Sequence, residues 1–165
     1  MLVAGMYGKG VNPETSSGET TGCTPEEYQT HFALWAMLNS PLILGCDLRY
    51  PDETTKKLLT NPDLIAINQD PEARNCYKLV CDCSPSAFTL VRPMSDGSLA
   101  AGIFNMGDAP VQSGFSFWDL GLSSSQGQHL RIYDCLRHTD LGLFREAFSA
   151  PVPAHGCQVV RCFPA

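Results

Sequence analysis

Residues 24–44 read TPEEYQTHFALWAMLNSPLIL, and this stretch decides the fold of the first half of the chain. Thr24 is a favourable N-cap, Pro25 suits the first helical position, and Glu27 completes a capping box three residues after Thr24. This spacing predicts an amphipathic helix over about 24–39. Its apolar face repeats every three or four positions, at Tyr28, Phe32, Trp35 and Leu38.

Shorter apolar segments flank this helix. Pro41 ends it, since proline disfavours helix in the residue before it. Leu42–Leu44 then forms a continuous apolar run, which is typical of a parallel strand buried on both faces. Met1–Tyr7 is another apolar run of strand length. Asp52 predicts the start of a second helix, which Asn61-Pro62 stops. Leu64–Ile67 is a short apolar segment that follows it.

Residues 1–70 therefore predict the order strand, helix, strand, helix. Connections of this length suit adjacent parallel strands, which build either a barrel or a doubly wound sheet. A complete (β/α)₈ barrel takes about 250 residues. Two β/α units cannot close one, so the sequence predicts only part of such a domain.

The second part of the chain changes character after Asp70-Pro71. Helical periodicity disappears, and short alternating segments separated by turn residues take its place. The Asp96-Gly97 pair is a hairpin signal, because both residues tolerate a positive φ. Strands of this length and spacing indicate a small antiparallel β-sandwich, joined to the first part by a linker around Gln69–Asn75. The predicted strands are Phe88–Val91, Leu99–Phe104, Gly114–Trp118, Leu130–Asp134 and Gln158–Phe163.

The composition limits the classes of function. The chain has 165 residues, of which 44% are hydrophobic and 17% charged, so it can bury a core. Its net charge of −6 argues against nucleic-acid and membrane partners, because no basic face can be built. No apolar run reaches the roughly 20 residues that a bilayer needs. The start MLVAGMYGKG has no charged n-region, so we expect no export signal and favour a cytoplasmic location.

The eight cysteines predict neither a disulfide framework nor a metal site. The tightest group, Cys76, Cys81 and Cys83, has spacings of five and two, and the chain contains no C-x-x-C pair. Small buried hydrophobes or reduced thiols are the favoured interpretation, and zinc is the less favoured one. We therefore expect neither a metal nor a cofactor. The remaining cysteines are Cys23, Cys46, Cys135, Cys157 and Cys162.

Few residues carry a recognisable catalytic pattern. Gly5–Gly10 is too short in its glycine spacing for a phosphate-binding loop and is more typical of a turn after a strand. His31 has no second ligand at metal-binding spacing, which favours a packed or surface histidine. Asp47 ends an apolar run, where barrel enzymes place catalytic groups, although a structural role is favoured. Histidines without a partner in the local sequence are His129, His138 and His155.

Several longer stretches are distinctive as they stand: MLVAGMYG at 1–8, FALWAMLNSPLIL at 32–44, CDLR at 46–49 and IAINQDP at 65–71. They closely resemble glycoside hydrolase family 27, which contains the α-galactosidases and α-N-acetylgalactosaminidases. The end of the chain is also similar to the last strands of that family's C-terminal β-sandwich. The residues that carry this second similarity are Asp140-Leu141-Gly142, Phe144, Phe148 and VPAHG at 152–156.

The resemblance implies a fold in two parts. Residues 1–71 would be the C-terminal part of a catalytic TIM barrel, contributing its last two β/α units, and residues 72–165 would be the antiparallel β-sandwich. It also implies that the family's two catalytic aspartates belong to earlier barrel strands, so no residue here is assigned a catalytic role. Met1 matches the methionine of the family's W-N-D-x-D-M motif and is therefore assigned to substrate binding in the sugar pocket.

Three functions remain open. The first is the C-terminal fragment of a retaining α-galactosidase acting on α-galactoside oligosaccharides or glycoconjugates, through two carboxylates about 5 Å apart. The second is a non-catalytic β-sandwich module that binds sugar or stabilises the fold. The sequence argues against sugar binding by this module, because Trp118 fits a core position better than an exposed sugar platform. The third is a truncated product without an independent role. We favour the first, with a chain that is inactive on its own.

Overall fold

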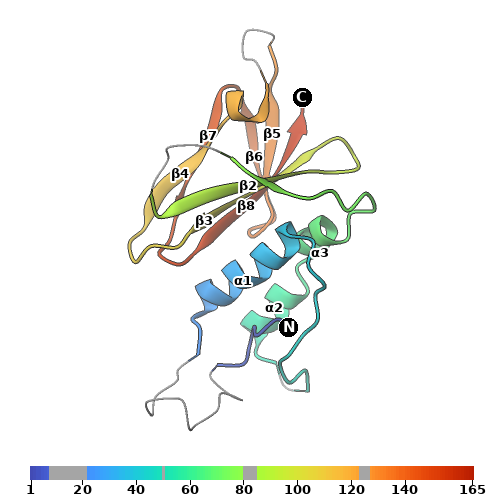
Figure 1. The fold of residues 1–165 in the computed structure, drawn as a ribbon, viewed down its shortest axis with the longest axis vertical. Coiled ribbons are helices and arrows are strands. Elements are labelled where there is room, and N and C mark those ends of the chain that lie inside the picture. Colours follow the sequence, from blue (N-terminus) through green and yellow to red (C-terminus); the bar gives the residue numbers. More distant parts are fainter. Residues whose placement is uncertain (8–21, 50, 80–84, 123–126) are drawn as a thin grey trace.

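The computed structural model describes residues 1–7, 22–49, 51–79, 85–122 and 127–165 of the chain. These residues form three layers (Figure 1). Helices from the N-terminal part cover one face of a six-stranded sheet, and a two-stranded sheet covers the other face. The antiparallel β-sandwich predicted for the second part of the chain is confirmed.

The six-stranded sheet is antiparallel and has the order β1-β2-β3-β8-β5-β6. Strand β8 is last in the sequence but lies in the middle of the sheet, so the C-terminal residues join its two halves. The predicted Asp96-Gly97 turn connects β2 to β3, and Gly97 there takes a φ of 82°. The strands are β1 (Tyr77–Lys78), β2 (Ala87–Pro93), β3 (Leu99–Asn105), β5 (Leu130–Asp134), β6 (Thr139–Phe144) and β8 (Cys157–Pro164).

The two-stranded sheet pairs β4 (Val111–Ser116) with β7 (Ala147–Val152), and a short 3₁₀ helix, η1 (Trp118–Leu120), follows β4. Phe115 and Phe148 lie opposite each other on this pair, with ring centroids 5.7 Å apart. They pack against apolar side chains from the facing sheet, so the sandwich closes a core of its own. The fully buried members of that core include Val91, Ile103, Ile132 and Val160.

Helix α1 (Pro25–Met37) begins as its sequence predicts. The Glu27 N–H donates to the Thr24 hydroxyl at 3.2 Å, and the Thr24 N–H donates to the Glu27 carboxylate at 2.7 Å. Both bonds of the capping box are therefore present, and each satisfies an N–H group that the helix itself leaves without a partner.

The C-terminal end of α1 is a Schellman motif. Asn39 takes a left-handed φ of 54°, and its N–H donates to the Ala36 carbonyl at 3.3 Å. The N–H of Ser40 donates to the Trp35 carbonyl at 3.0 Å. These bonds end the helix ahead of Pro41, which agrees with the predicted end near residue 39.

The buried face of α1 differs from the predicted stripe. Tyr28 and Phe32 are buried as expected, but Trp35 is only half-buried and Leu38 is 53% exposed. Small side chains at the contact allow the helix to lie close to the sheet, which leaves the larger Trp35 at the margin. The buried face is completed by Ala33, Ala36 and Met37.

Helix α2 (Glu53–Leu59) also begins as predicted, with Asp52 as its N-cap. The Asp52 carboxylate accepts the Thr55 N–H at 2.9 Å and the Thr55 hydroxyl at 2.6 Å. Bonds from the Thr55 hydroxyl and backbone lower the pKa of Asp52, because they favour its charged form. This carboxylate is therefore engaged in capping the start of α2.

The sequence predicts only a short apolar segment at Leu64–Ile67. The structure instead has a helix there, α3 (Pro62–Asn68). The Asn61 side-chain oxygen accepts the N–H groups of Asp63 and Leu64, each at 3.0 Å. Pro62 takes the first helical position, where its missing N–H costs nothing. The Asn-Pro pair thus starts this helix as well as stopping the preceding one.

The prediction of two extended parallel strands within residues 1–70 is wrong. Their segments meet in a single parallel bridge between Leu2 and Leu44. Ile43 is 57% exposed, so the run Leu42–Leu44 is not buried on both faces. A parallel strand needs hydrogen-bonded neighbours, and among the described residues these two segments pair only with each other.

Within the sandwich, β2, β3, β5 and β8 follow the predicted strands closely, whereas periodicity does not mark β1, β6 or β7. Strand β6 exposes both Leu141 and Leu143, which removes the alternation that a half-buried strand normally shows. The placement of Trp118 in a strand and in the core is wrong. Strand β4 ends at Ser116, and Trp118 lies on η1 with 79% of its surface exposed.

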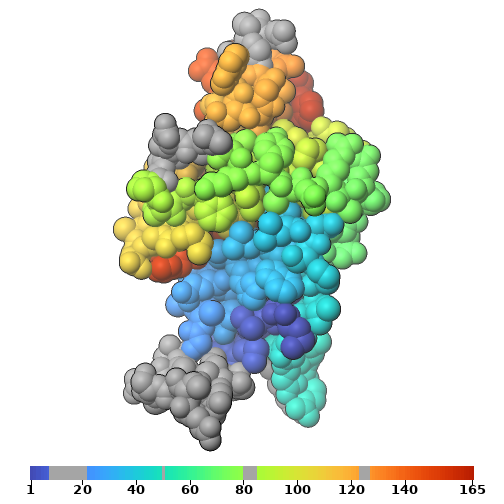
Figure 2. Space-filling model, viewed as in Figure 1, coloured from blue at the N-terminus to red at the C-terminus, as the bar shows by residue number. Residues whose placement is uncertain are grey.

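A second core joins the helices to the six-stranded sheet. Phe104 of β3 stacks on Phe88 of β2 with ring centroids 5.4 Å apart, on the face that α1 covers. In Figure 2 the blue and cyan surfaces of the helices lie directly against the green surface of the sheet. The two parts of the chain therefore share buried surface. Fully buried members of this core include Leu2, Phe32, Met37, Leu64 and Ile67.

Candidate functional site

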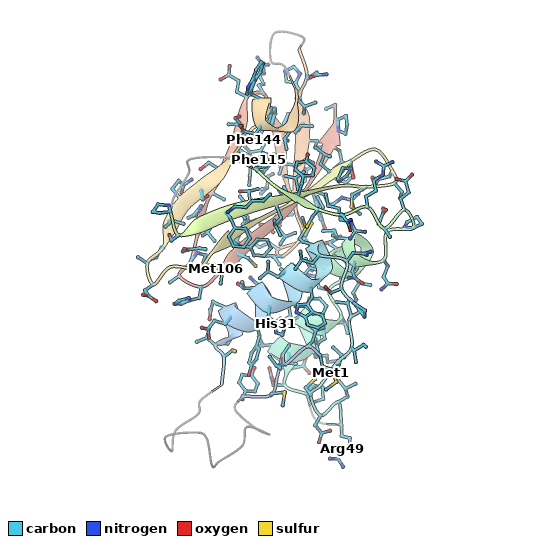
Figure 3. The ribbon with its side chains drawn as sticks, in the orientation of Figure 1. Met1, His31, Arg49, Met106, Phe115 and Phe144 are labelled. Carbon is cyan, nitrogen blue, oxygen red and sulfur yellow. The ribbon has the colours of Figure 1, made fainter. Side chains whose placement is uncertain are left out.

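The candidate site lies where the N-terminal segment meets the segment that follows Pro41. The Leu2 N–H donates to the Ile43 carbonyl at 2.8 Å, and the Gly45 N–H donates to the Leu2 carbonyl at 2.9 Å. These two bonds form the parallel bridge. Met1, the residue that the resemblance assigns to substrate binding, lies beside the bridge and is 74% exposed (Figure 3).

Met1 lies against Gly45 of the neighbouring segment. A Cβ atom added to Gly45 would lie 3.1 Å from the Leu2 carbonyl oxygen and 3.5 Å from the Met1 Cβ. Glycine thus allows the two segments to approach closely. The exposed thioether of Met1 offers an adaptable apolar contact, which suits the apolar face of a ligand.

The chain leaving the bridge is fixed by contacts with both neighbouring helices. Gly5 has a φ of 79°, and a Cβ there would lie 2.6 Å from Thr55 of α2. The Tyr7 N–H donates to the Tyr28 hydroxyl of α1 at 2.7 Å, and the two rings meet edge to face with centroids 5.3 Å apart. The sequence signals for this arrangement are weak, because its members come from three separate segments. The rest of the predicted turn Gly5–Gly10 lies outside the described residues.

Asp47 is exposed and paired with Arg49. The Arg49 guanidinium donates to both carboxylate oxygens, with its Nη2 2.7 Å from Oδ2 and its Nε 3.0 Å from Oδ1. The Arg49 backbone N–H donates to the same carboxylate at 3.0 Å. This carboxylate is therefore engaged by a neighbour two residues away, which orients the turn that it occupies.

His31 lies on α1 near the candidate site and packs against Trp35. The two rings meet edge to face, with centroids 5.5 Å apart. Burial lowers the pKa of His31, and the positive N-terminal amino group lowers it further. The neutral imidazole is therefore the favoured form near pH 7, in a packed aromatic environment.

Two of the histidines that lack a local partner are paired across the fold, which corrects the sequence interpretation. His138 Nδ1 lies 2.6 Å from Asp63 Oδ2, and His155 Nε2 lies 2.9 Å from Asp108 Oδ1. The partners are 75 and 47 residues apart in the sequence, so no local pattern could identify them. His129 lies in the segment before β5.

A cavity of about 720 Å³ lies beside the His138 pair. It is bordered by the first turns of α1, by α2 and the turn into α3, and by two loops of the sandwich. Its polar side chains carry charges of both signs, and its apolar lining consists mainly of prolines and leucines. The polar residues that line it include Glu26, Gln29, Lys57, Asn61 and His138.

The described residues contain no group of three or more histidine, cysteine or acidic side chains placed to hold a metal ion. Six cysteines are described, and each is a free thiol. Burial raises the pKa of Cys157 to about 11 and that of Cys162 to about 12, so both thiols are protonated at neutral pH. Cys81 and Cys83 lie outside the described residues. None of the described helices is long and apolar enough to cross a membrane.

Sequence reasoning also missed a buried arginine at the contact between α1 and the sheet. Arg92 of β2 has no exposed surface, and it donates to groups at the C-terminal end of α1. Arginine is rarely buried without a partner, but its position in a strand pattern gives no sign of burial. Only the approach of the helix to this face identifies it.

Two protein-family models match the chain one after the other. The model described as alpha galactosidase A matches residues 3–70, which contain the three helices, Leu44 of the bridge and Asp47. The model described as the alpha galactosidase C-terminal beta sandwich domain matches residues 88–162. Together they cover most of the helical part and most of the sandwich described above.

Relatives and solved structures agree with these matches. An α-galactosidase of Cyamopsis tetragonoloba is 32% identical over 138 residues, covering 84% of this chain and 33% of the relative. Alpha-galactosidase 2 of Arabidopsis thaliana is 33% identical, with 84% and 34% covered. A Bacteroides fragilis structure assigned to the α-galactosidases/melibiases has a TM-score of 0.81 at 34% identity, covering 98% of this chain and 33% of that one.

The chain thus spans about a third of the length of the relatives it matches, with 33% and 34% of the first plant enzymes covered. The match runs through both the helical part and the sandwich, and it agrees with the motifs quoted from residues 1–8, 32–44 and 65–71. The chain belongs to glycoside hydrolase family 27 and corresponds to the C-terminal portion of its α-galactosidases.

Proposed function

We propose that this chain forms the C-terminal portion of a retaining α-galactosidase that hydrolyses terminal α-D-galactosyl residues of oligosaccharides or glycoconjugates. One observation carries the proposal: the alpha galactosidase A model and the alpha galactosidase sandwich model match the chain consecutively, in the family's order. The relatives named α-galactosidase share 32% and 33% identity with it over most of its length. Trp118 is 79% exposed, so it no longer argues against a separate binding module, but the consecutive family matches favour the α-galactosidase.

Within this proposal, residues 1–71 are the last two β/α units of a (β/α)₈ barrel and residues 72–165 are the sandwich domain. The parallel bridge at Leu2 and Leu44 supports this, because parallel pairing across an intervening helix is the barrel's basic unit. Met1 would then lie on the barrel's inner rim, with its exposed side chain in the sugar pocket. A yeast α-galactosidase solved with raffinose shares this fold, with a TM-score of 0.78 at 18% identity.

The proposal also assigns no catalytic role to a residue of this chain. Retaining hydrolysis needs a nucleophilic carboxylate and an acid/base carboxylate about 5 Å apart across the scissile bond. Asp47 is engaged by Arg49, and Asp52 caps α2. We therefore expect the chain by itself not to cleave α-galactosides, and Met1 to contact the sugar only in the full enzyme.

The test compares the purified chain with a fusion in which the upstream barrel portion of the Cyamopsis tetragonoloba relative precedes it. An aryl α-galactoside serves as the substrate. We expect no turnover by the chain alone, turnover by the fusion, and a raised KM when Met1→Ala is introduced into the fusion. Leu48→Ala, at an exposed apolar position of the next segment, is the matched control and should leave KM unchanged.

Two outcomes would overturn the proposal. Turnover by the chain alone that is lost in Asp47→Asn would assign a catalytic role to a residue that we treat as structural. A folded fusion without turnover would show that the chain does not complete an α-galactosidase.

A further inference from the structure

The arginine buried between the sandwich and helix α1 has a position that stability alone does not explain. Arg92 is the largest side chain among those with almost no exposed surface. Its Nε is buried and finds no hydrogen-bond partner among the residues that the structure describes. A buried cation that is incompletely bonded costs free energy, and an apolar residue of similar volume is often as stable or more stable.

The guanidinium holds the end of helix α1. Its Nη1 donates to the Ala36 carbonyl at 3.4 Å, and its Nη2 donates to the Asn39 side-chain oxygen at 3.3 Å. Ala100 lies opposite Arg92 on the neighbouring strand, and its small side chain leaves space for the arginine to reach the helix. The contact therefore joins strand β2 to the Schellman motif of α1.

The charge of Arg92 is balanced by Asp70, which follows helix α3. Burial by itself would raise the pKa of Asp70, but bonds from the Ser95 and Glu72 backbones and the nearby charge of Arg92 lower it overall. The Asp70 carboxylate accepts the Ser95 N–H at 2.9 Å and the Ser95 hydroxyl at 2.7 Å. Asp70 thus remains hydrogen-bonded even without the arginine.

A second side chain holds the same turn from the other side. The Asn68 amide at the end of α3 donates to the Ser40 carbonyl at 2.9 Å and to the Trp35 carbonyl at 3.3 Å. The turn at Asn39 and Ser40 leads directly into Leu42–Leu44, the segment that forms the bridge with Leu2. Its position therefore decides where the bridge lies.

We propose that Arg92 is a positioning residue, through which the sandwich fixes the turn at Asn39 and thereby the bridge segment against which Met1 lies. This inference rests on the proposed function, since that function assigns Met1 to the sugar pocket. The sandwich then sets the geometry of the pocket rim as well as covering the helices. Neither the catalytic aspartates nor a direct sugar contact is involved.

The first experiment measures amide hydrogen exchange in the full chain and in Arg92→Met, which keeps the volume and removes the guanidinium. We expect the amides of Leu2 and Gly45 to exchange about tenfold faster, the change that loss of one charge-assisted hydrogen bond produces. Amides of the β5–β8 ladder should change less than about twofold. The NMR signal of the Met1 methyl group should shift at the same time.

Asn39→Gly supplies a second variant that is easier to fold. Glycine retains the left-handed φ of 54° but removes the oxygen that accepts from Arg92. It should also move the Met1 methyl signal and speed exchange at Leu2 and Gly45, by less than Arg92→Met does. Arg161→Met is the matched control, because the hydrogen bonds of Arg161 to described residues lie within the sandwich, at Ser98 and Asp96.

Unchanged exchange at Leu2 and Gly45 in both variants would overturn the inference. Equal acceleration at the bridge and in the β5–β8 ladder would also overturn it, since that result indicates a general loss of stability. These measurements use the chain itself. An inactive fusion would therefore refute the proposed function and leave the exchange result intact.

Discussion

The two regions of the molecule close their cores in different ways. The sandwich buries its inner face between two sheets, and its central side chains come from strands on both sides. The described part of residues 1–70 has three helices and one parallel bridge, and its apolar residues are buried mainly against the sandwich sheet. Large apolar side chains that remain exposed in this region include Met1, Leu38, Ile43 and Leu48.

This difference shows which structures a local signal can produce. The caps of the helices in residues 1–70 satisfy backbone groups within four residues, so a local signal marks where each helix begins, and packing against the sheet then stabilises it. A parallel strand has no such local solution, since all its backbone bonds go to other segments. The bridge beside Met1 is therefore the part of the region that depends most on its neighbours.

The sharpest test of this comparison is Phe32→Ala in helix α1. Phe32 is 1% exposed and lies in the core between helix and sheet, so its truncation should cost about 3–5 kcal/mol of unfolding free energy. Trp35→Ala is the matched variant on the same helix. Trp35 is only half-buried, so it should cost about half as much.

Urea unfolding followed by far-UV and near-UV circular dichroism gives both values. We expect one transition for each variant, because the helices and the sandwich share a core. Two separate transitions, with the sandwich signal unchanged in Phe32→Ala, would show that the regions fold independently.

A second prediction concerns pH at the contact between the regions. Burial raises the pKa of Cys157 to about 11 from its ordinary value of 9.0, against the opposing hydrogen bonds from Thr30 and Gln29. The unfolded thiol loses its proton first, so the stabilisation is complete below pH 9.0 and is lost as the pH rises to about 11. The loss should reach about 3 kcal/mol at most.

The measurement is the unfolding free energy of the chain and of Cys157→Ala at several pH values between 8 and 11. The variant should lose less stability over this range, because it has no thiol to ionise. Cys23→Ala removes a less buried thiol outside the sheet whose pKa burial also raises, so it should recover less of the lost stability than Cys157→Ala does. Identical slopes for all three proteins would contradict the assignment to Cys157.

Much of the fold follows from the sequence, and the exceptions have physical reasons. The capping box at Thr24 and the cap at Asp52 were readable because each acts over three residues. Helix α3 was missed because Asn61-Pro62 is both a helix stop and a helix start, and the following four apolar residues show no clear period. Strand β6 was missed because both its leucines are exposed.

The candidate site is predictable only in part. Met1 could be singled out through a family motif, and the structure places it beside the bridge with an exposed side chain. The pairs of His138 with Asp63 and of His155 with Asp108 join residues far apart in sequence, so their discovery required the fold. Arg92 is similar, since its burial depends on where α1 lies on the sheet.

A third and smaller effect is expected at Asn61, which links the two regions. Its oxygen caps α3, and its amide donates to the Cys135 carbonyl of the sandwich at 3.0 Å. Asn61→Ala should cost about 2 kcal/mol, from the lost cap and the unsatisfied buried carbonyl. Asn61→Asp keeps the cap but sets a buried carboxylate against the Cys135 carbonyl in place of the donor, so it should not restore the stability of the unaltered chain. Equal stability of Asn61→Ala and the unaltered chain in urea unfolding would show that this link contributes nothing.

The smallest effect is expected at Trp118, where the sequence favoured a core position and the structure shows an exposed one. Trp118 lies on η1 at the end of β4 with 79% of its surface exposed, so its removal forfeits little buried area. Trp118→Ala should therefore leave the urea midpoint unchanged, whereas Phe115→Ala on the adjacent strand should lower it strongly, because Phe115 is 3% exposed and packs on Phe148. The variant also leaves Trp35 as the single tryptophan, and its emission should lie at shorter wavelength than that of the unaltered chain. A large loss of stability in Trp118→Ala would mean that this side chain packs into the sandwich. The sandwich core would then extend to η1, and the contrast with the more exposed N-terminal region would no longer hold at that end of the molecule.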